Sequence, residues 1–258
     1  MRIFDCFMFY DEEVVLDIRL NSLKNFVDCF VIVESKFYHS GKKRDLKFDI
    51  NNYPKLKDKI IYIVQDEEPY NLEQLKKSDD DSLITQKIIS NAHKRENFQR
   101  NLINKGLDKA NEDDLIMISD VDEIPNLKDL NVARVNNKIV IFEQSIFYYK
   151  LNRFLEGFTW HGTKACKKKN LKSPQWIRNV KNKNFGFWRL DTFFSETKYI
   201  NKIFIKDGGW HFSNLKNPVD VEKKLRSYLH HRDFEVENID LKEISKLMKN
   251  NETIYDMF

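Results

Sequence analysis

Cysteines are scarce in this sequence, and their positions exclude two kinds of site. The chain has three, Cys6, Cys29 and Cys166, and none is spaced as in a zinc-binding pair. Their odd number argues against a disulfide framework, and Cys6 and Cys29 lie in apolar runs that indicate buried strands. We therefore expect reduced thiols and a reducing compartment.

Long apolar runs are also missing. No stretch reaches the roughly 20 residues that span a bilayer, and acidic residues follow the first predicted strand by Asp11, unlike a signal peptide. These features predict a soluble protein of the cytoplasm with no transmembrane segment. Neither a glycine-rich dinucleotide fingerprint nor a P-loop is present, so NAD and ATP chemistry are not expected.

A strong charge of one sign is the third absence. The 44 basic and 40 acidic residues leave a net charge of +4 over 258 residues, which argues against a nucleic-acid partner. Hydrophobic residues make up 41% of the chain, enough for one large core. Because no repeat, low-complexity segment or linker interrupts the sequence, we expect a single domain over residues 1–258.

The spacing of apolar residues in the first half predicts an α/β fold. Strands are expected at residues 2–9, 29–33, 59–64 and 115–118, and helices at 11–26 and 83–107. Strands that alternate with helices predict a parallel sheet with crossover helices. Ligands bind beyond the carboxyl ends of the strands in such sheets.

The second half has a different pattern of strands and polar loops. Strands are expected at 139–149, 184–190 and 203–210, a solvated lysine-rich loop at 164–172, and helices at 218–231 and 241–248. We therefore predict a Rossmann-like nucleotide-binding half at about 1–125 and a mixed acceptor-side half at about 126–258.

An acidic run follows the fourth predicted strand. Asp120 and Asp122 are one residue apart at the strand end, so both carboxylates can reach one cation if the backbone turns there. Hard oxygen ligands suit Mg²⁺ or Mn²⁺, which also bind diphosphates. The run therefore predicts a metal site, and the alternative is a solvated acidic turn.

Two further segments carry candidate binding residues. His211 follows two glycines that let a backbone approach a ligand closely, and its imidazole could bind a metal or a phosphate. On the predicted helix before the acidic strand, Arg100 is favoured over Arg95 as the residue that reaches the site, where it could pair with phosphate or orient a carboxylate. The alternatives are a core histidine and solvated helix charges.

Taken together, these stretches resemble glycosyltransferase family 17, the family of the enzyme that adds the bisecting residue to N-glycans. The matching runs are Ile3-Phe4-Asp5-Cys6-Phe7 with Glu12 or Glu13, Phe30-Val31-Ile32-Val33-Glu34-Ser35 with Ser40-Gly41, Gln99-Arg100-Asn101, Ile118-Ser119-Asp120-Val121-Asp122-Glu123-Ile124-Pro125, Tyr148-Tyr149 with Asn152, Gly209-Trp210-His211-Phe212-Ser213, and Lys224, Ser227 and His230. They span nearly the whole chain.

The resemblance implies a GT-A-like fold with a mixed sheet flanked by helices, a UDP-sugar donor, a divalent cation (Mn²⁺ or Mg²⁺) and inversion at the anomeric carbon. It implies that Asp120 and Asp122 hold the metal, with His211 as a further ligand. Arg100, Glu34 and the strand end near Phe7 would line the nucleotide side. The transferred sugar would be GlcNAc or a related hexose or pentose, and the acceptor a glycan or glycoconjugate.

An inverting transfer needs a carboxylate as general base within reach of the acceptor hydroxyl. Asp207 and Glu123 are equal candidates, with Glu143 as a third. Aromatic side chains such as Tyr149, Trp160 and Trp188 could stack on sugar rings, although most aromatic residues must belong to the core.

Two other functions remain open at this point. A metal-dependent phosphatase or nuclease would also need clustered acids, but a haloacid-type phosphatase places its aspartates after the first strand. A carbohydrate- or nucleic-acid-binding module could use basic loops at 42–44 and 167–169. The near-neutral net charge and the buried strand before the acidic run argue against such a module.

Overall fold

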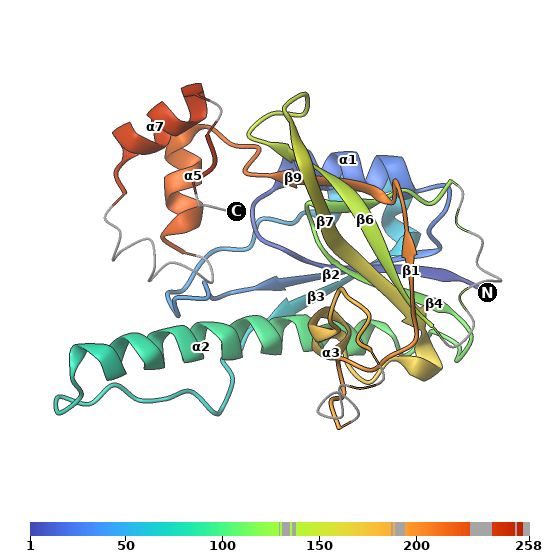
Figure 1. Cartoon of the computed structure of the whole chain (residues 1–258), viewed down its shortest axis with the longest axis horizontal. Coiled ribbons are helices and arrows are strands. Elements are labelled where there is room, and N and C mark those ends of the chain that lie inside the picture. The colour runs from blue at the N-terminus through green and yellow to red at the C-terminus, as the bar shows by residue number, and fades with distance from the viewer. Residues whose placement is uncertain are drawn as a thin grey trace.

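A sheet of nine strands organises the part of the chain that the computed structural model describes, which is residues 1–128, 130, 135, 138–186, 188, 194–227, 239–250 and 252–254. The strands are β1 (Ile3–Phe9), β2 (Cys29–Ser35), β3 (Ile60–Gln65), β4 (Leu115–Asp120), β5 (Glu123–Pro125), β6 (Ile139–Tyr148), β7 (Phe154–Lys167), β8 (Lys202–Ile205) and β9 (Gly209–Ser213). The α-helices are α1 (Glu13–Leu23), α2 (Asp81–Asn101), α3 (Pro174–Asn179), α5 (Pro218–Leu225) and α7 (Leu241–Asn250). These elements form a mixed α/β fold (Figure 1).

The first four strands form the parallel part of the sheet, in the order β3-β2-β1-β4. Their residues are almost all apolar because both faces of this part are covered. β7 then pairs antiparallel with β4, and the order continues through β6, β9 and β5, with β8 beside β6. Since the parallel strands end at one edge, the residues that follow β1, β2 and β4 meet there.

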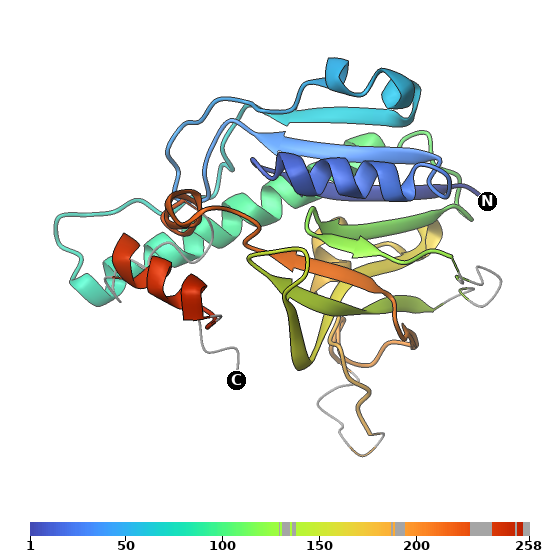
Figure 2. The same cartoon turned by 90° about the horizontal axis from the view of Figure 1, so that it is seen from above.

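Helices cover both faces of the sheet (Figures 1 and 2). α1 packs on one face through a buried stripe that includes Leu16, Leu20 and Leu23. α2 and α3 lie on the other face, where Ile103 and Ile177 enter a second apolar cluster. A third cluster joins α5 and α7 to β6, beside the carboxyl ends of the parallel strands. No helix among the described residues is long and apolar enough to span a membrane.

The predictions for the first half are confirmed. The strands expected at 2–9, 29–33, 59–64 and 115–118 are β1, β2, β3 and β4, and the helices expected at 11–26 and 83–107 are α1 and α2 with a 3₁₀ turn at Leu102–Gly106. The strands and α1 have the apolar spacing typical of their type, whereas the buried residues of α2 are mostly polar: Asn91, Ala92, Gln99 and Arg100.

The predictions for the second half are confirmed only in part. The strand expected at 139–149 is β6, and the helix at 241–248 is α7. The strand expected at 203–210 is two strands, β8 and β9, because the backbone turns between them at Asp207, where φ is 49°. Residues 184–186 and 188 lie in no strand, and the rest of 184–190 lies outside the described residues. The helix expected at 218–231 is confirmed for 218–225 as α5, residues 226–227 form a turn, and 228–231 lie outside the described residues.

The solvated loop expected at 164–172 is wrong for 164–167, whereas 168–172 form a 3₁₀ turn and coil in which Lys169 and Lys172 are exposed. Residues up to Lys167 belong to β7, and the side chain of Lys164 is buried beneath the sheet. Its ammonium donates hydrogen bonds to the carbonyl of Arg178 at 2.8 Å and to that of Val180 at 2.5 Å, at the end of α3. A lysine-rich run can therefore form a strand, because the aliphatic part of a lysine side chain can be buried when its ammonium donates hydrogen bonds to carbonyl oxygens.

The buried lysine predicts a specific pH dependence of stability. Burial, followed by the nearby charge of Arg178, lowers the pKa of Lys164 to about 7, whereas an unfolded lysine titrates near 10.4. Between these values the unfolded chain binds more protons, so this group makes the folded state more stable as pH rises. Relative to Lys164→Met, the wild-type free energy of unfolding should increase by about 1–3 kcal/mol from pH 7 to pH 9.5.

Urea denaturation of both proteins at several pH values measures this difference. The comparison cancels the contributions of other groups, such as the cysteine thiols, that titrate in the same range. A difference that stays constant with pH would show that Lys164 is charged throughout and is stabilised by the two carbonyls.

Candidate functional site

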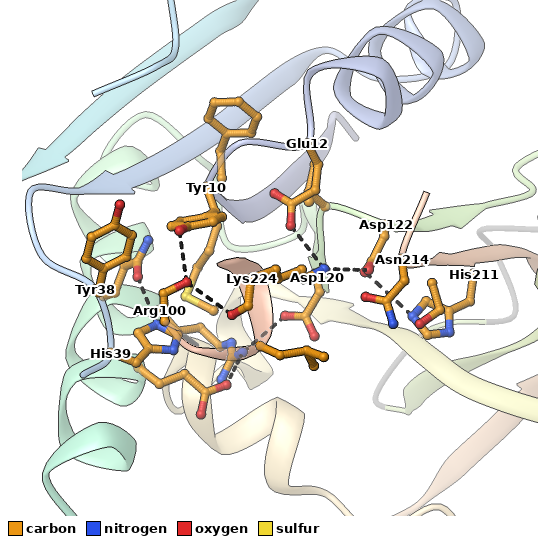
Figure 3. Close-up of a pocket in the computed structure, with 18 of the residues that line it drawn as sticks. Tyr10, Glu12, Tyr38, His39, Arg100, Asp120, Asp122, His211, Asn214 and Lys224 are labelled. Carbon is orange, nitrogen blue, oxygen red and sulfur yellow. Dashed lines mark hydrogen bonds and ion pairs between the residues drawn. The ribbon is translucent and has the colours of Figure 1, made fainter. Parts of the chain in front are cut away.

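A cavity of about 390 Å³ opens where β1, β2 and β4 end (Figure 3). Tyr10 and Glu12 enter it from the segment after β1, and Tyr38 from the loop after β2. The end of α2, the turn after β4, β9 and α5 complete its walls. The cavity therefore collects side chains from both halves of the chain.

The turn after β4 brings two distant motifs together. β4 ends at Asp120, and β5 begins only three residues later and pairs antiparallel with β9, with Glu123 opposite His211. The amide of Phe212 donates a hydrogen bond to the carbonyl of Asp122 at 2.9 Å. As a result, Oδ1 of Asp122 lies 3.7 Å from Nε2 of His211.

The Asp120 carboxylate lies between two arginines. Nη2 of Arg100 lies 3.1 Å from Oδ1, and Nη2 of Arg178 lies 3.0 Å from Oδ2. Burial alone would raise the pKa of Asp120, but the two guanidinium groups outweigh it and hold this pKa well below its ordinary value. The side chain is still 38% exposed toward the cavity, so an ionised oxygen donor is available there.

The Asp122 carboxylate also has two basic neighbours. His211 lies 3.7 Å away, and Nζ of Lys224 lies 4.0 Å from Oδ2 and 3.2 Å from Glu12. Burial would raise the pKa of Asp122, but the charges of His211 and Lys224 lower it overall. Lys224 comes from α5, so this helix closes the cavity with a cation placed between two carboxylates.

Glu123 faces away from the cavity and organises the residues around it. Its side chain is fully buried and accepts hydrogen bonds from the amide of Asp120, from Nε1 of Trp160 and from both terminal nitrogens of Arg178, all between 2.7 and 2.9 Å. One carboxylate thus fixes the backbone of the acidic turn, an indole and a guanidinium. Its oxygens are fully engaged.

The rings of Trp160 and His211 stack on one wall of the cavity. Their centroids are 4.5 Å apart and their planes differ by 16°. Because Nε1 of Trp160 is held by Glu123, the indole has a fixed orientation. Nδ1 of His211 is buried and has no hydrogen-bond partner in the described part of the chain.

An aromatic and basic group forms the opposite end of the cavity (Figure 3). The rings of Tyr10 and Tyr38 are 5.6 Å apart, and the guanidinium of Arg44 lies over them at 4.3 and 5.9 Å. Arg44 is fixed by Glu34, whose buried carboxylate also accepts hydrogen bonds from the amides of 47 and 48. This end presents flat faces and a positive charge.

The structure places four of the predicted binding residues around the cavity: Arg100, Asp120, Asp122 and His211. Phe7 and Glu34 do not line it. Phe7 belongs to the core beside α1, and Glu34 lies behind Arg44. The strand end that does reach the cavity is Met8 to Tyr10.

The other candidates of the sequence analysis lie away from the cavity. Arg95 pairs with Glu68 at 2.6 Å, and the side chain of Glu143 faces His161. Asp207 is exposed at the far end of β9, beside Asn126 rather than His211. The glycine at 209 serves the strand pairing, since φ is 130° and a Cβ would lie 2.1 Å from the carbonyl of Ile124.

Of the three aromatic candidates, one lines the cavity and two do not. Trp160 lines the cavity, whereas Trp188 is 71% exposed outside it. Tyr149 is buried and donates a hydrogen bond to the carbonyl of Glu252, and its neighbour Tyr148 lines the cavity instead.

Sequence analysis missed Tyr10, Tyr38, Arg44 and Glu96, which line the cavity, and two arginines that contact the acidic turn from outside it. Arg178 follows Pro174 in a short helix that no periodicity indicates, and Arg19 lies on the buried face of α1. Only Arg19 has a visible signal, since a charged residue stands among the apolar residues of a helical stripe.

The carboxylate oxygens of the acidic turn are suitable ligands for a divalent cation whose other ligands come from a phosphate. Within the described ranges no three His, Cys, Asp or Glu side chains form a cluster that could hold a metal by themselves. Mg²⁺ and Mn²⁺, however, are commonly bound through one or two carboxylates together with substrate phosphates and water. Asp120 and Asp122 supply such carboxylates, and His211 lies beside Asp122 with Nε2 3.7 Å from its Oδ1.

Comparison with protein families identifies the family of this chain. The model of Glycosyltransferase family 17 matches residues 1–258, the full length of the sequence. No curated protein matches the chain.

The contacts of Glu123 predict a large effect on stability. Glu123→Gln removes the buried charge that pairs with Arg178, so the free energy of unfolding should fall by about 3 kcal/mol, in the range for a broken buried ion pair. Glu143→Gln, on a half-exposed carboxylate, should change it by no more than about 0.5 kcal/mol. Chemical denaturation at pH 7 compares the two. Equal losses would contradict the role given to Glu123.

Proposed function

Because this chain belongs to glycosyltransferase family 17, we propose that it transfers a sugar from a UDP-sugar to a hydroxyl group of a glycan, with Mn²⁺ or Mg²⁺ at the acidic turn. Glycosyl transfer follows from the family. The donor, the cation and inversion at the anomeric carbon are the finer parts of the proposal. The observation that carries them is the cavity at the carboxyl ends of the parallel strands, which combines the acidic turn with an aromatic end.

The topology supports the proposal of a GT-A-like arrangement. Four parallel strands in the order β3-β2-β1-β4 are followed by the antiparallel β7. In open sheets of this kind a ligand is bound outside the carboxyl ends of the strands. Residues 1–125 would then bind the nucleotide, and residues 126–258 would contribute the acceptor side.

The charges around the cavity support a divalent cation. The carboxylates of Glu12, Glu96, Asp120 and Asp122 are each within an ion-pair distance of Arg100, Lys224 or another base. A UDP-sugar would add two negative charges to a site whose own charges are already paired. A divalent cation held by Asp120 and Asp122 restores the balance, and when bound it neutralises the charge that develops on the leaving diphosphate.

The shape of the cavity indicates how the donor would lie. Tyr10 and Tyr38 offer flat faces for the uracil ring at one end. Arg100 and Lys224 lie beside the acidic turn, where they would donate to the diphosphate oxygens. The stacked Trp160 would then face the sugar, whose axial C–H groups pack on an indole.

We assign the general base of the transfer to Glu12. Of the carboxylates that line the cavity, Asp120 and Asp122 belong to the cation site and Glu96 pairs with Arg100 at 2.7 Å. Glu12 has one ion-pair partner among the described residues, Lys224 at 3.2 Å, and its Oε2 accepts a hydrogen bond from the amide of Asp11 at 3.2 Å. It would take the proton of the acceptor hydroxyl as that oxygen attacks the anomeric carbon and the bond to the diphosphate breaks.

Thermal unfolding with a panel of nucleotides tests the donor and the cation together. UDP at about 100 times its Kd should raise the Tm by roughly 5–10 °C, but only when Mn²⁺ is present. Asp122→Asn should abolish this shift and the transfer, and it should also lower the Tm of the free protein by a few degrees because His211 and Lys224 lose a charged partner. Asp113→Asn, on an exposed carboxylate far from the cavity, is the matched control and should retain both. No shift with any nucleotide, or a full shift in Asp122→Asn, would overturn the proposal.

The assignment of Glu12 predicts a separation of binding from chemistry. Glu12→Gln should lower kcat at least 100-fold, as expected for loss of general base catalysis, and leave the Kd of UDP within about threefold of the wild type. Steady-state kinetics and calorimetric titration measure the two quantities. A higher Kd with an unchanged kcat would instead place Glu12 among the nucleotide ligands.

A further inference from the structure

Arg19 is a fully buried charged residue that does not line the cavity. It lies on the face of α1 that packs on the sheet, in a stripe otherwise made of Val15, Leu16, Leu20 and Leu23. Burial of a guanidinium costs free energy, and apolar residues of similar volume often stabilise a fold as well or better. The contacts of Arg19 therefore need an explanation beyond packing.

The partner of Arg19 is the carboxylate of Asp5 in the middle of β1. Nε donates to Oδ2 at 2.8 Å and Nη2 to Oδ1 at 2.5 Å, in a two-bond pair with both side chains fully buried. The guanidinium also lies 4.5 Å from the ring of Phe7. β1 and α1 thus hold the guanidinium in one orientation.

The remaining donors of Arg19 all point at the acidic turn. Nη1 lies within hydrogen-bond distance of three carbonyl oxygens, those of Asp120 at 3.1 Å, Val121 at 3.2 Å and Glu123 at 2.8 Å. Nη2 also donates to the hydroxyl of Ser119. A single side chain therefore contacts the backbone on both sides of Asp122.

These contacts complete the hydrogen bonding of the turn. The fourth carbonyl, that of Asp122, accepts from the amide of Phe212, so every carbonyl from residue 120 to residue 123 has a partner. With the carbonyls drawn toward α1, the carboxylates of Asp120 and Asp122 reach the cavity from the same turn. A cation ligated by only two protein carboxylates needs both in fixed positions.

We propose that Arg19, oriented by Asp5, is a positioning residue that sets the backbone of the acidic turn for cation and diphosphate binding. This inference rests on the proposed function for its consequence, whereas the rigidity of the turn is a property of the ligand-free protein. Arg19→Lys keeps the charge opposite Asp5 but cannot reach all of the carbonyls. Arg2→Gln is the matched control. It removes an ion pair with Asp114 that joins the start of β1 to the start of β4, at the ends of these strands away from the acidic turn.

The first measurement is hydrogen exchange of the peptide that covers residues 115–125, without any ligand. Arg19→Lys should exchange at least about tenfold faster there than the wild type, with β2 unchanged, and Arg2→Gln should match the wild type over the turn. Ser119→Ala, which removes one contact of Arg19, should show a smaller change in the same direction and serves if Arg19→Lys does not fold. An unchanged turn in the folded variants would overturn the proposal, whatever the protein binds.

The second measurement is the half-saturating concentration of Mn²⁺ for UDP-dependent thermal stabilisation. Arg19→Lys should raise it about 10- to 100-fold, as for other residues that orient metal ligands, whereas Arg2→Gln should leave it unchanged. A lower Tm with an unchanged Mn²⁺ dependence would show that the pair serves stability alone and would also overturn the proposal. Absence of any Mn²⁺ effect in the wild type would instead count against the proposed function and leave the exchange result standing.

Discussion

The requirement that buried charges be compensated governs the centre of this structure. Asp120 lies between Arg100 and Arg178, and Asp122 lies beside His211 and Lys224. Because each partner comes from a different element, the acidic turn binds α2, α3, β9 and α5 to the edge of the parallel sheet. Removal of any one charge takes a partner from another charge in a largely buried place, which costs stability. The cavity and its lining follow from this constraint.

The same charges connect the fold to glycosyl transfer. A site whose own charges are paired has no surplus positive charge for a diphosphate, so the donor and a divalent cation would enter as a neutral pair. Arg100 and Lys224 would exchange part of their contacts with carboxylates for contacts with phosphate oxygens. Such an exchange uses groups that are already oriented, which is how an enzyme limits reorganisation during transfer.

Sequence reasoning predicted the parallel half of the fold well, because its strands are continuous apolar runs and α1 has a buried apolar stripe. It also predicted that Asp120, Asp122, His211 and Arg100 belong together, from the position of the acidic run after a strand and from the family resemblance. The structure brings these four residues to one cavity.

The rest depends on contacts between residues distant in sequence. β7 was missed because its lysines indicate a loop. In the structure, the ammonium of Lys164 donates hydrogen bonds to carbonyl oxygens at the end of α3. Asp207-Gly208-Gly209 does indicate a turn, but the sequence does not show that this turn places Asp207 at the far end of β9, away from the cavity. Glu123 follows the acidic pair directly, yet the pairing of β5 with β9 turns its side chain into the interior. Residues adjacent in sequence can therefore have different roles when a strand alternates its faces.

A crystal structure of the protein with UDP and Mn²⁺ tests the central claim most directly, since anomalous scattering locates the manganese without reference to activity. The account predicts one manganese ion about 2.0–2.3 Å from carboxylate oxygens of Asp120 and Asp122 and in contact with the diphosphate. UDP bound in the cavity with its phosphates held by Arg100 and Lys224 alone, or a manganese ion elsewhere, would contradict it.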